Sequence, residues 1–267
     1  MARTERGRIR IGVGGWSYDP WRETFYPKGL PRGRELEHAS RRLTSIEIDS
    51  TYYGGKTPET FRTWRDAAPD DFVFAVKGSR YVTNRRALAE AGPSIERFFQ
   101  TGVTELRHKL GPINWQFAAT KKFDPDDFGA FLALLPKSVE GVTLRHAVEV
   151  RNPSFRTQGF VDLARSQGVG VIIAGDSEFP LIADVTAPFV YARIMGTREE
   201  EAIGYPEKAL EAWAARARTW AEGGAPEDLA PVGPPSQAPA REVFLYVISG
   251  FKAHNPLAAT ALIERIG

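Results

Sequence analysis

Thr44-Ser-Ile-Glu-Ile-Asp-Ser-Thr-Tyr-Tyr53 is the stretch that decides the fold. Ile46 and Ile48 alternate with Glu47 and Asp49, and a period of two is the signature of a β-strand. If the isoleucines pack beneath helices, the two carboxylates point into the interior of a closed parallel sheet. An unpaired carboxylate is costly to bury there. We therefore expect the rest of the chain to supply polar partners for Glu47 and Asp49.

Apolar runs alternate with helical patterns along the whole chain. With Ser45–Asp49, the predicted strands are Ile9–Val13, Phe72–Lys77, Ile113–Ala118, Ala147–Arg151, Val169–Ala174, Phe189–Met195 and Val243–Ser249. The predicted helices are Arg34–Leu43, Glu59–Ala67, Ser94–Leu110, Pro125–Leu135, Phe155–Gln167, Glu207–Ala221 and Leu257–Ile266. Only the sixth connection, Asp176–Pro188, is too short for a full helix. The alternation predicts an α/β fold, a (β/α)₈ TIM-type barrel with parallel strands.

Two connections are unusually long for a compact barrel. Gly14–Gly33, after the first strand, is rich in aromatic residues. Gly223–Ala240, before the last strand, is rich in proline and glycine and is interpreted as a flexible excursion that carries no chemistry. Since no internal boundary interrupts the alternation, we expect a single domain over residues 1–267.

Composition limits the class of protein. The 267 residues include 35 basic and 33 acidic side chains, and a formal net charge of +2 indicates no strong field for a polyanion. Cysteine is absent, which excludes disulfides, thiolate nucleophiles and cysteine metal sites. No segment has the pattern of a signal peptide or a membrane span. We expect a soluble cytoplasmic protein with no membrane partner, and its oligomeric state is left open.

Extending the alternation to every strand gives a set of inward polar side chains near the carboxyl ends of the strands, where barrel enzymes build their sites. Acids and bases are nearly balanced, so mutual ion pairing as scaffold is one interpretation. A charged ring in a core usually filled by branched apolar residues favours a ligand site instead. The set comprises Glu47, Asp49, Lys77, Asn114, Gln116, Glu149, Arg151, Asp176, Tyr191, Arg193 and Tyr246.

Loops after the strands offer further contacts. Trp16 and Tyr18 could roof the barrel mouth and stack on a sugar or base, although such aromatics also pack as ordinary loop core. Tyr52 is another candidate contact. Ser249–Lys252 precedes the last helix, where many barrels bind phosphate, so Lys252 and Arg193 would suit an anion. The alternative is a tight turn with a solvated lysine.

Metal chemistry finds little support in the sequence. The four histidines, His38, His108, His146 and His254, all lie away from the carboxyl ends of the predicted strands. A barrel metal hydrolase usually needs several histidines there. We therefore expect no cofactor and no metal, with a carboxylate-only Mg²⁺ site as the weaker alternative. Its ligands would come from Glu47, Asp49, Glu149 and Asp176.

Motifs in order along nearly the whole chain support the barrel. They are Ile11-Gly-x-Gly-Gly-Trp16-Ser17-Tyr18-x-x-Trp21, Phe25-Tyr26-Pro27-x-Gly29, Ile46-Glu47-Ile-Asp-Ser50-Thr51-Tyr52-Tyr53, Phe72-x-Phe-Ala-x-Lys77, Leu110-Gly111-Pro112-x-x-x-Gln116, Ala147-Val-Glu149-x-Arg151 and Tyr191-x-Arg193. Together they resemble the YecE-like family (domain of unknown function 72). The resemblance implies a (β/α)₈ barrel. It implies no activity, because the family has no established reaction.

The chain departs from the family pattern at three places. Asn84 follows Thr83 where the family often has histidine, and Met195-Gly196 replaces a His-Gly pair. Ser249-Gly250 replaces an asparagine–aspartate pair. These changes remove two histidines and one carboxylate, so they disfavour a histidine- or metal-based mechanism and indicate a divergent member.

The leading hypothesis is a hydrolase or isomerase acting on a polar, anionic small molecule, phosphorylated or sugar-like. Glu47, Glu149 and Lys77 are the candidate catalytic residues, since carboxylates in different environments can hold different protonation states. Glu47→Gln is expected to abolish turnover and leave the fold intact. The candidate substrate-binding residues are Trp16, Tyr18, Asp49, Tyr52, Gln116, Arg151, Asp176, Arg193, Tyr246 and Lys252.

Two other classes of function stay open. A nucleic-acid-binding or phosphodiester-processing barrel could use the arginine-rich stretch Arg80–Arg86 to contact phosphates, although such runs are more often solvated loops. A barrel that binds a ligand without catalysis is compatible with the substitutions at Asn84 and Met195. A nucleic-acid partner is therefore a possibility that the sequence does not favour over a small anionic ligand.

Overall fold

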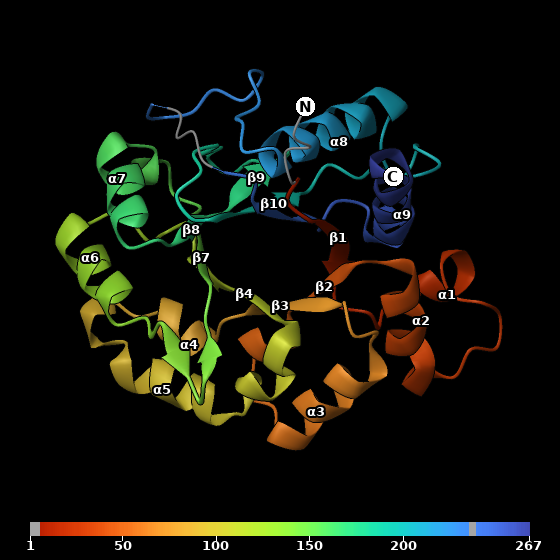
Figure 1. The fold of residues 1–267 in the computed structure, drawn as a ribbon, viewed down its shortest axis with the longest axis horizontal. Helices are drawn as coiled ribbons and strands as arrows, with labels where there is room; N and C mark the ends of the chain where they lie inside the picture. The colour runs from red at the N-terminus through yellow and green to blue at the C-terminus, as the bar shows by residue number, and fades with distance from the viewer. Residues whose placement is uncertain (1–5, 235–238) are drawn as a thin grey trace.

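The strands form one parallel barrel with the helices outside it, as the computed structural model of residues 6–234 and 239–267 shows (Figure 1). In chain order the barrel strands are β1 Ile9–Gly14, β2 Ser45–Ile48, β3 Val73–Lys77, β4 Leu110–Gln116, β7 His146–Glu149, β8 Gly170–Val171, β9 Ile173–Gly175, β10 Phe189–Ile194 and β11 Glu242–Val247. A separate antiparallel hairpin, not predicted from the sequence, joins β5 Ser138–Val139 to β6 Val142–Thr143.

The barrel closes through its sixth strand, which changes partners along its length. The sheet order is β8-β7-β4-β3-β2-β1-β11-β10-β9. Its two ends, β8 and β9, are consecutive pieces of one strand separated by Ile172. The first piece pairs with β7 and the second with β10, and the amide of Ile172 donates to the Val148 carbonyl (2.9 Å). The eight predicted strands therefore close into the expected (β/α)₈ barrel.

The helices surround the sheet, and all except the short α1 and α4 lie close to predicted positions. They are α1 Trp21–Thr24, α2 Glu35–Arg42, α3 Pro58–Ala67, α4 Arg80–Thr83, α5 Gly92–Gln100, α6 Pro125–Ala133, α7 Gln158–Ser166, α8 Glu207–Ala221 and α9 Asn255–Ile266. Short 3₁₀ helices lie at η1 Arg32–Arg34, η2 Ser50–Tyr52, η3 Leu88–Glu90, η4 Val103–Lys109, η5 Pro153–Phe155 and η6 Lys252–His254. Residues 176–188 form no helix, as expected for the short sixth connection.

One predicted helix is wrong in its length. Ser94–Leu110 is divided into α5 and η4, because Gly102 between them adopts φ 88°, in the left-handed region. A Cβ at Gly102 would also lie 2.7 Å from the Pro58 ring, so glycine is required on both grounds. The apolar spacing continues across this break, which is why the sequence suggests one long helix.

Alternation along the strands separates two cores. Ile46 and Ile48 are buried against the helices, as predicted, and belong to the large cluster between sheet and helices. Inside the barrel a smaller cluster includes Ala75, Ile172 and Phe244. The middle of the barrel is thus filled by side chains, and polar groups lie at its two ends.

Charges also occupy the amino-terminal end of the barrel, which the sequence analysis did not anticipate. Arg10 and Arg145 both pair with Glu242, and the Arg145 guanidinium lies 5.0 Å from the centre of the Phe244 ring. The expectation that inward charges gather only at the carboxyl ends is therefore wrong. Arg10 shares the inner face of β1 with Gly12 and Gly14, so alternation alone places it inside.

The aromatic connection after β1 packs mainly as core. Trp21 is fully buried, and the Trp16 ring meets Trp64 of α3 edge to face at 5.0 Å. The Tyr26 hydroxyl donates to the Trp16 carbonyl, which fixes the loop. Of the two residues expected to roof the mouth, Trp16 is thus turned onto α3. Tyr18 lies beside Lys252, whose ammonium is 4.7 Å from the ring centre.

The connection before β11 is anchored where the structure describes it. Leu229 is buried, and the Asp184 carboxylate accepts hydrogen bonds from the amides of Val232 (2.7 Å) and Gly233 (2.9 Å). Positions 235–238 of the predicted excursion lie outside the described residues. The described part of this segment therefore has specific contacts that its proline- and glycine-rich composition does not indicate.

Candidate functional site

Three buried charges form the centre of the carboxyl-terminal end of the barrel. Arg193 of β10 lies between Glu47 of β2 and Glu149 of β7, and all three side chains are almost fully removed from solvent. Its Nη2 is 3.1 Å from Glu47 Oε1, and its Nη1 donates to Glu149 Oε2. The inward alternation of three separate strands thus brings two predicted carboxylates onto one predicted arginine.

Neutral groups complete the coordination of the two carboxylates. The Tyr191 hydroxyl donates to Glu47 Oε2, and Asn114 Nδ2 is 3.3 Å from Glu47 Oε2 and 3.4 Å from Glu149 Oε2. Alternation marks Tyr191 and Asn114 as inward, but neither was among the predicted site residues. Deeper in the barrel, Tyr246 is fully buried, and its hydroxyl lies 2.7 Å from Ser45 Oγ. We call Glu47, Glu149, Arg193, Tyr191 and Asn114 the buried network.

Two cations lie above the buried network and are partly exposed. Arg151 Nε donates to Glu149 Oε1 (2.7 Å), and its Nη2 donates to Gln116 Oε1 (2.9 Å). The guanidinium also lies 4.2 Å from the centre of the Phe179 ring, in the short sixth connection. On the other side, Lys77 Nζ lies 4.7 Å from the centre of the Tyr52 ring. Arg151 and Lys77 are the cationic rim of the network.

The electrostatics of these groups are strongly coupled. Burial lowers the pKa of the Lys77 ammonium, and the negative charge of Glu47 opposes this effect only in part. Burial alone would raise the pKa of Glu149, but the charges of Arg193 and Arg151 outweigh it and hold the pKa below its usual value. Burial also raises the pKa of Tyr191, whose proton stays on its oxygen. Two carboxylates therefore face three cations, counting Lys77 as protonated.

Other predicted residues lie apart from this cluster. Asp176 is exposed and accepts a hydrogen bond from Trp213 Nε1 (2.7 Å), on the side of α8. Lys252 lies over the Tyr18 ring, whereas both terminal nitrogens of Arg193 contact the glutamates. The two cations that were expected to bind one anion together therefore have different partners. Asp49 directly follows β2 and is half-buried.

The residues of this end do not form a ready metal site. Among the residues that the structure describes, no three histidine, aspartate or glutamate side chains come together as a ligand set. Glu47 and Glu149, proposed for the Mg²⁺ alternative, direct oxygens to Arg193 instead. Within the same described ranges, no helix has both the length and the apolar character needed to cross a bilayer.

The departures from the family pattern occupy distinct environments. Asn84 is exposed on the loop after α4, and Met195 is buried at the end of β10. Ser249 and Gly250 both have positive φ, of 61° and 56°. A Cβ at Gly250 would lie 2.4 Å from Thr197 Oγ1, so the close approach of two loops requires glycine here.

Fold and charged centre together define a closed (β/α)₈ barrel with an ionic network at its carboxyl end. The chain belongs to the DUF72 family, because the family model described as "Protein of unknown function DUF72" matches residues 10–267. No curated protein matches it significantly.

Solved structures agree on the architecture. A DUF72 family protein from Thermotoga maritima is 18% identical, with a TM-score of 0.71 over 96% of this chain and 98% of that one. A DUF72 family protein from Enterococcus faecalis is 17% identical, with a TM-score of 0.69 over 98% of both chains. A structure described as SacUVDE is 10% identical, with a TM-score of 0.52 over 97% of both chains. At these identities the likeness concerns the fold alone.

Proposed function

We propose that this barrel is an enzyme for a small, polar, anionic substrate that binds between Lys77 and Arg151. The observation that carries the proposal is the charge balance at the carboxyl end. Arg193 is enclosed by Glu47 and Glu149, and over the network and the rim together there is one more cation than carboxylates, with the unenclosed cations at the partly exposed rim. A bound anion would neutralise that surplus, and arginine offers a carboxylate or phosphate two donors at once.

The buried network holds the rim in place. Glu47 and Glu149 are fully buried, so the groups that reach a substrate first are Lys77 and Arg151. Glu149 orients Arg151 through Nε, and Phe179 and Gln116 hold the same guanidinium from two other directions. The two glutamates and Arg193 therefore act as positioning residues in this proposal.

Lys77 is the proposed group for proton transfer. Burial lowers its pKa, so the protonated ammonium gives up its proton more readily than an exposed lysine does and can donate it to the substrate. Proton transfer next to an anionic group fits an isomerase or a hydrolase acting on a sugar phosphate or a related acid. This assignment places the chemistry on one of the three catalytic candidates of the sequence analysis.

A ligand screen by thermal unfolding tests the proposal. The panel contains phosphate, sugar phosphates, small carboxylic acids and neutral sugars. A ligand present at a hundredfold its dissociation constant stabilises the folded state by about 2.7 kcal/mol. We expect stabilisation by an anionic ligand, its loss in Arg151→Gln, and its retention in Lys137→Met, where the exposed lysine lies between α6 and β5, in the connection that leads to the amino-terminal end of β7.

Turnover of the ligand found in this way separates the alternatives. Followed by NMR, conversion should disappear in Lys77→Arg, while the ligand still binds to that variant, because arginine keeps the positive charge at the rim but does not give up its proton. Binding without conversion by the wild type would instead support a non-catalytic ligand barrel. Equal stabilisation by neutral sugars, unaffected in Arg151→Gln, would refute the anionic site.

A further inference from the structure

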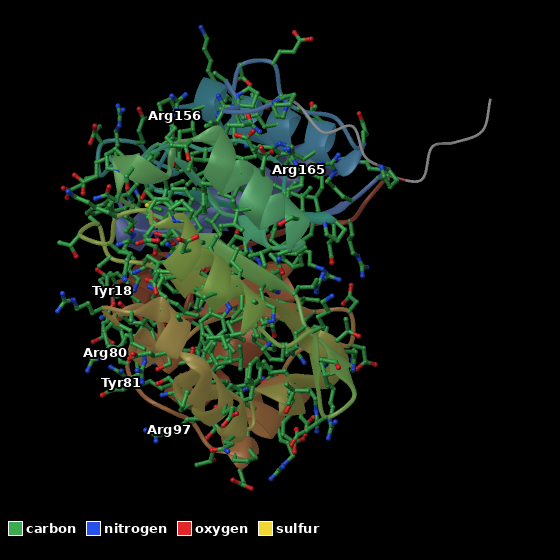
Figure 2. The ribbon with its side chains drawn as sticks, turned by 90° about the vertical axis from the view of Figure 1, so that its left-hand side faces the viewer. Tyr18, Arg80, Tyr81, Arg97, Arg156 and Arg165 are labelled. Atoms are coloured by element: carbon green, nitrogen blue, oxygen red, sulfur yellow. The ribbon has the colours of Figure 1, made fainter. Side chains whose placement is uncertain are left out.

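Three neighbouring cavities that share lining residues lie beside the barrel mouth, over α4. The first, of about 370 Å³, and the second, of about 440 Å³, are both lined by Tyr81, Ser94 and Arg97. The second and the third, of about 730 Å³, share Asn84 and Arg85. We call the surface that these three cavities line the α4 groove. Figure 2 shows Arg80, Tyr81 and Arg97 along the same edge of the molecule as Tyr18, which belongs to the loop after β1.

The α4 groove is strongly cationic. Its basic lining residues are Arg80, Arg85, Arg86, Arg97, Lys121 and Lys122, against the acidic residues Asp124 and Asp127. Lys121 pairs with Asp127 at 3.7 Å. The other five cations form no ion pair with any residue that the structure describes. A nearly neutral protein thus concentrates unpaired positive charge along one groove.

Aromatic rings accompany the charge. Tyr53 and Tyr81 are 66% and 62% exposed, the highest values among the large hydrophobic side chains of the described residues. The Arg80 guanidinium lies near both rings, 5.9 Å from the Tyr53 ring centre and 5.4 Å from that of Tyr81. Keeping two rings in water is unfavourable, so a flat partner that stacks on them would lower the free energy.

We propose that the α4 groove binds single-stranded nucleic acid. A row of cations that follows a phosphate backbone, together with aromatic rings on which bases stack, is the combination that sequence-tolerant single-strand binding requires. Duplex bases are already stacked on each other and cannot cover Tyr53 and Tyr81, which favours the single strand. This binding is independent of the small-anion chemistry proposed above.

The groove also leads toward the barrel mouth. Thr51 lines its first cavity, and the Thr51 hydroxyl donates to the carbonyl of Lys77 (2.6 Å). The neighbouring Tyr52 lies under the Lys77 ammonium. A strand bound in the groove would therefore bring one of its nucleotides toward the cationic rim.

Fluorescence anisotropy with labelled oligothymidylate and oligouridylate tests the phosphate contacts. The test variant is Arg86→Gln/Lys122→Gln, because both side chains are exposed and line the groove. Arg85 is left intact, since it donates to Ser94 Oγ (2.8 Å) and the Tyr81 carbonyl. The matched control, Lys137→Gln/Lys208→Gln, removes the same charge from exposed positions elsewhere.

The salt dependence supplies the expected magnitude. Each phosphate contact contributes about −0.7 to the slope of log affinity against log salt for single strands. The test variant should therefore lose about 1.4 of the slope, and the control should keep the wild-type slope. No binding at low salt, or equal losses in both double variants, would refute the proposal.

Substitution of Tyr81 tests the stacking contribution separately. Tyr81→Leu should weaken oligonucleotide binding about tenfold, and Tyr81→Phe should bind like the wild type. If inorganic polyphosphate competes as well as the oligonucleotide and Tyr81→Leu has no effect, the groove is a general polyanion site and the proposal is wrong. Tighter binding of a duplex would also overturn it. Arg151→Gln should bind the oligonucleotide like the wild type. The test of small-anion binding at the rim and the test of oligonucleotide binding in the groove can therefore fail independently.

Discussion

Arg193 is the residue on which the buried network depends, because it compensates two carboxylates at once. Arg193→Met leaves Glu47 and Glu149 buried with fewer cations, and removal of one partner of a buried ion pair typically costs about 3–5 kcal/mol. We expect a loss of this size in the free energy of unfolding, measured by urea denaturation.

The matched control removes the charges together. Arg193→Met/Glu47→Gln/Glu149→Gln has no buried network charge to compensate, so most of the lost stability should return. If the triple variant is no more stable than Arg193→Met, the loss reflects packing and the electrostatic explanation fails.

The contribution of Glu149 to the pH dependence of stability should have opposite signs in the wild type and in Arg193→Met. In the wild type the lowered pKa of Glu149 stabilises the fold above its ordinary value of 4.5, and this stability is lost as the pH falls through the folded pKa. In Arg193→Met burial dominates and raises the carboxyl pKa. His146 contributes equally to both proteins, so the stability of the variant relative to the wild type should decrease as the pH rises from about 5 to 7.

Alternation along strands predicts the members of the network but not their pairing. It correctly places Glu47, Glu149 and Arg193 on the inner face. Which carboxylate meets which cation depends on the stagger of neighbouring strands, which a single sequence does not contain. Phe179 was missed because it lies on a loop, where no periodic pattern shows that it reaches Arg151.

At the scale of the element, His146 fixes the start of β7 to its neighbours. Its Nδ1 accepts a hydrogen bond from Trp115 Nε1 (3.1 Å) on β4, so its Nε2 donates to the Pro136 carbonyl (2.8 Å) after α6. Burial lowers the pKa of His146 from 6.5 to about 4. A protonated ring would present two N–H groups, and the bond from Trp115 would be lost.

His146 should make the stability of the fold sensitive to mild acid. The unfolded chain binds the proton more tightly, so stability decreases as the pH falls from 6.5 to about 4, by roughly 3 kcal/mol. Unfolding in urea across this range measures the effect. His146→Gln keeps an acceptor and a donor but does not titrate, so the stability of this variant should change less between pH 6.5 and about 4. If the variant loses as much stability over this range as the wild type does, His146 is not the group responsible.

Elements with strong periodicity were predicted well, and short ones were not. The predicted bounds of α8 agree with the structure, because apolar residues recur along the whole helix. Helix α4 has only four residues and no room for a period, although it carries the groove described above. The break at Gly102 is visible only as one glycine in a continuing pattern.

At the scale of the molecule, the two ends of the barrel interior have separate ionic clusters. Arg10, Arg145 and Glu242 lie at the amino-terminal end, with Phe244 and other apolar side chains between them and the buried network. The closed fold itself could be predicted, because eight strands and their connecting segments leave few other arrangements. The ionic cluster at the amino-terminal end could not be predicted, because its composition depends on the residue at which each strand begins.

Glu242→Gln should reduce stability without affecting ligand binding at the other end. The carboxylate is partly exposed, so we expect a loss of about 2 kcal/mol, below the range for a fully buried pair. Urea denaturation measures that loss, and titration with the anionic ligand from the screen should give the wild-type affinity. A weakened affinity would show that the two ends are coupled.

The pairing of β1 with β11 has a consequence for biosynthesis. Ile9 lies opposite Val243, and Val13 opposite Val247. The first strand of the barrel to be synthesised therefore cannot pair along this edge until the last strand has been translated. Until then one edge of β1 has no strand to cover its backbone amides and carbonyls, and such edges invite pairing with other chains. Co-translational folding of this barrel can therefore reach completion only after nearly the whole described sequence has been translated.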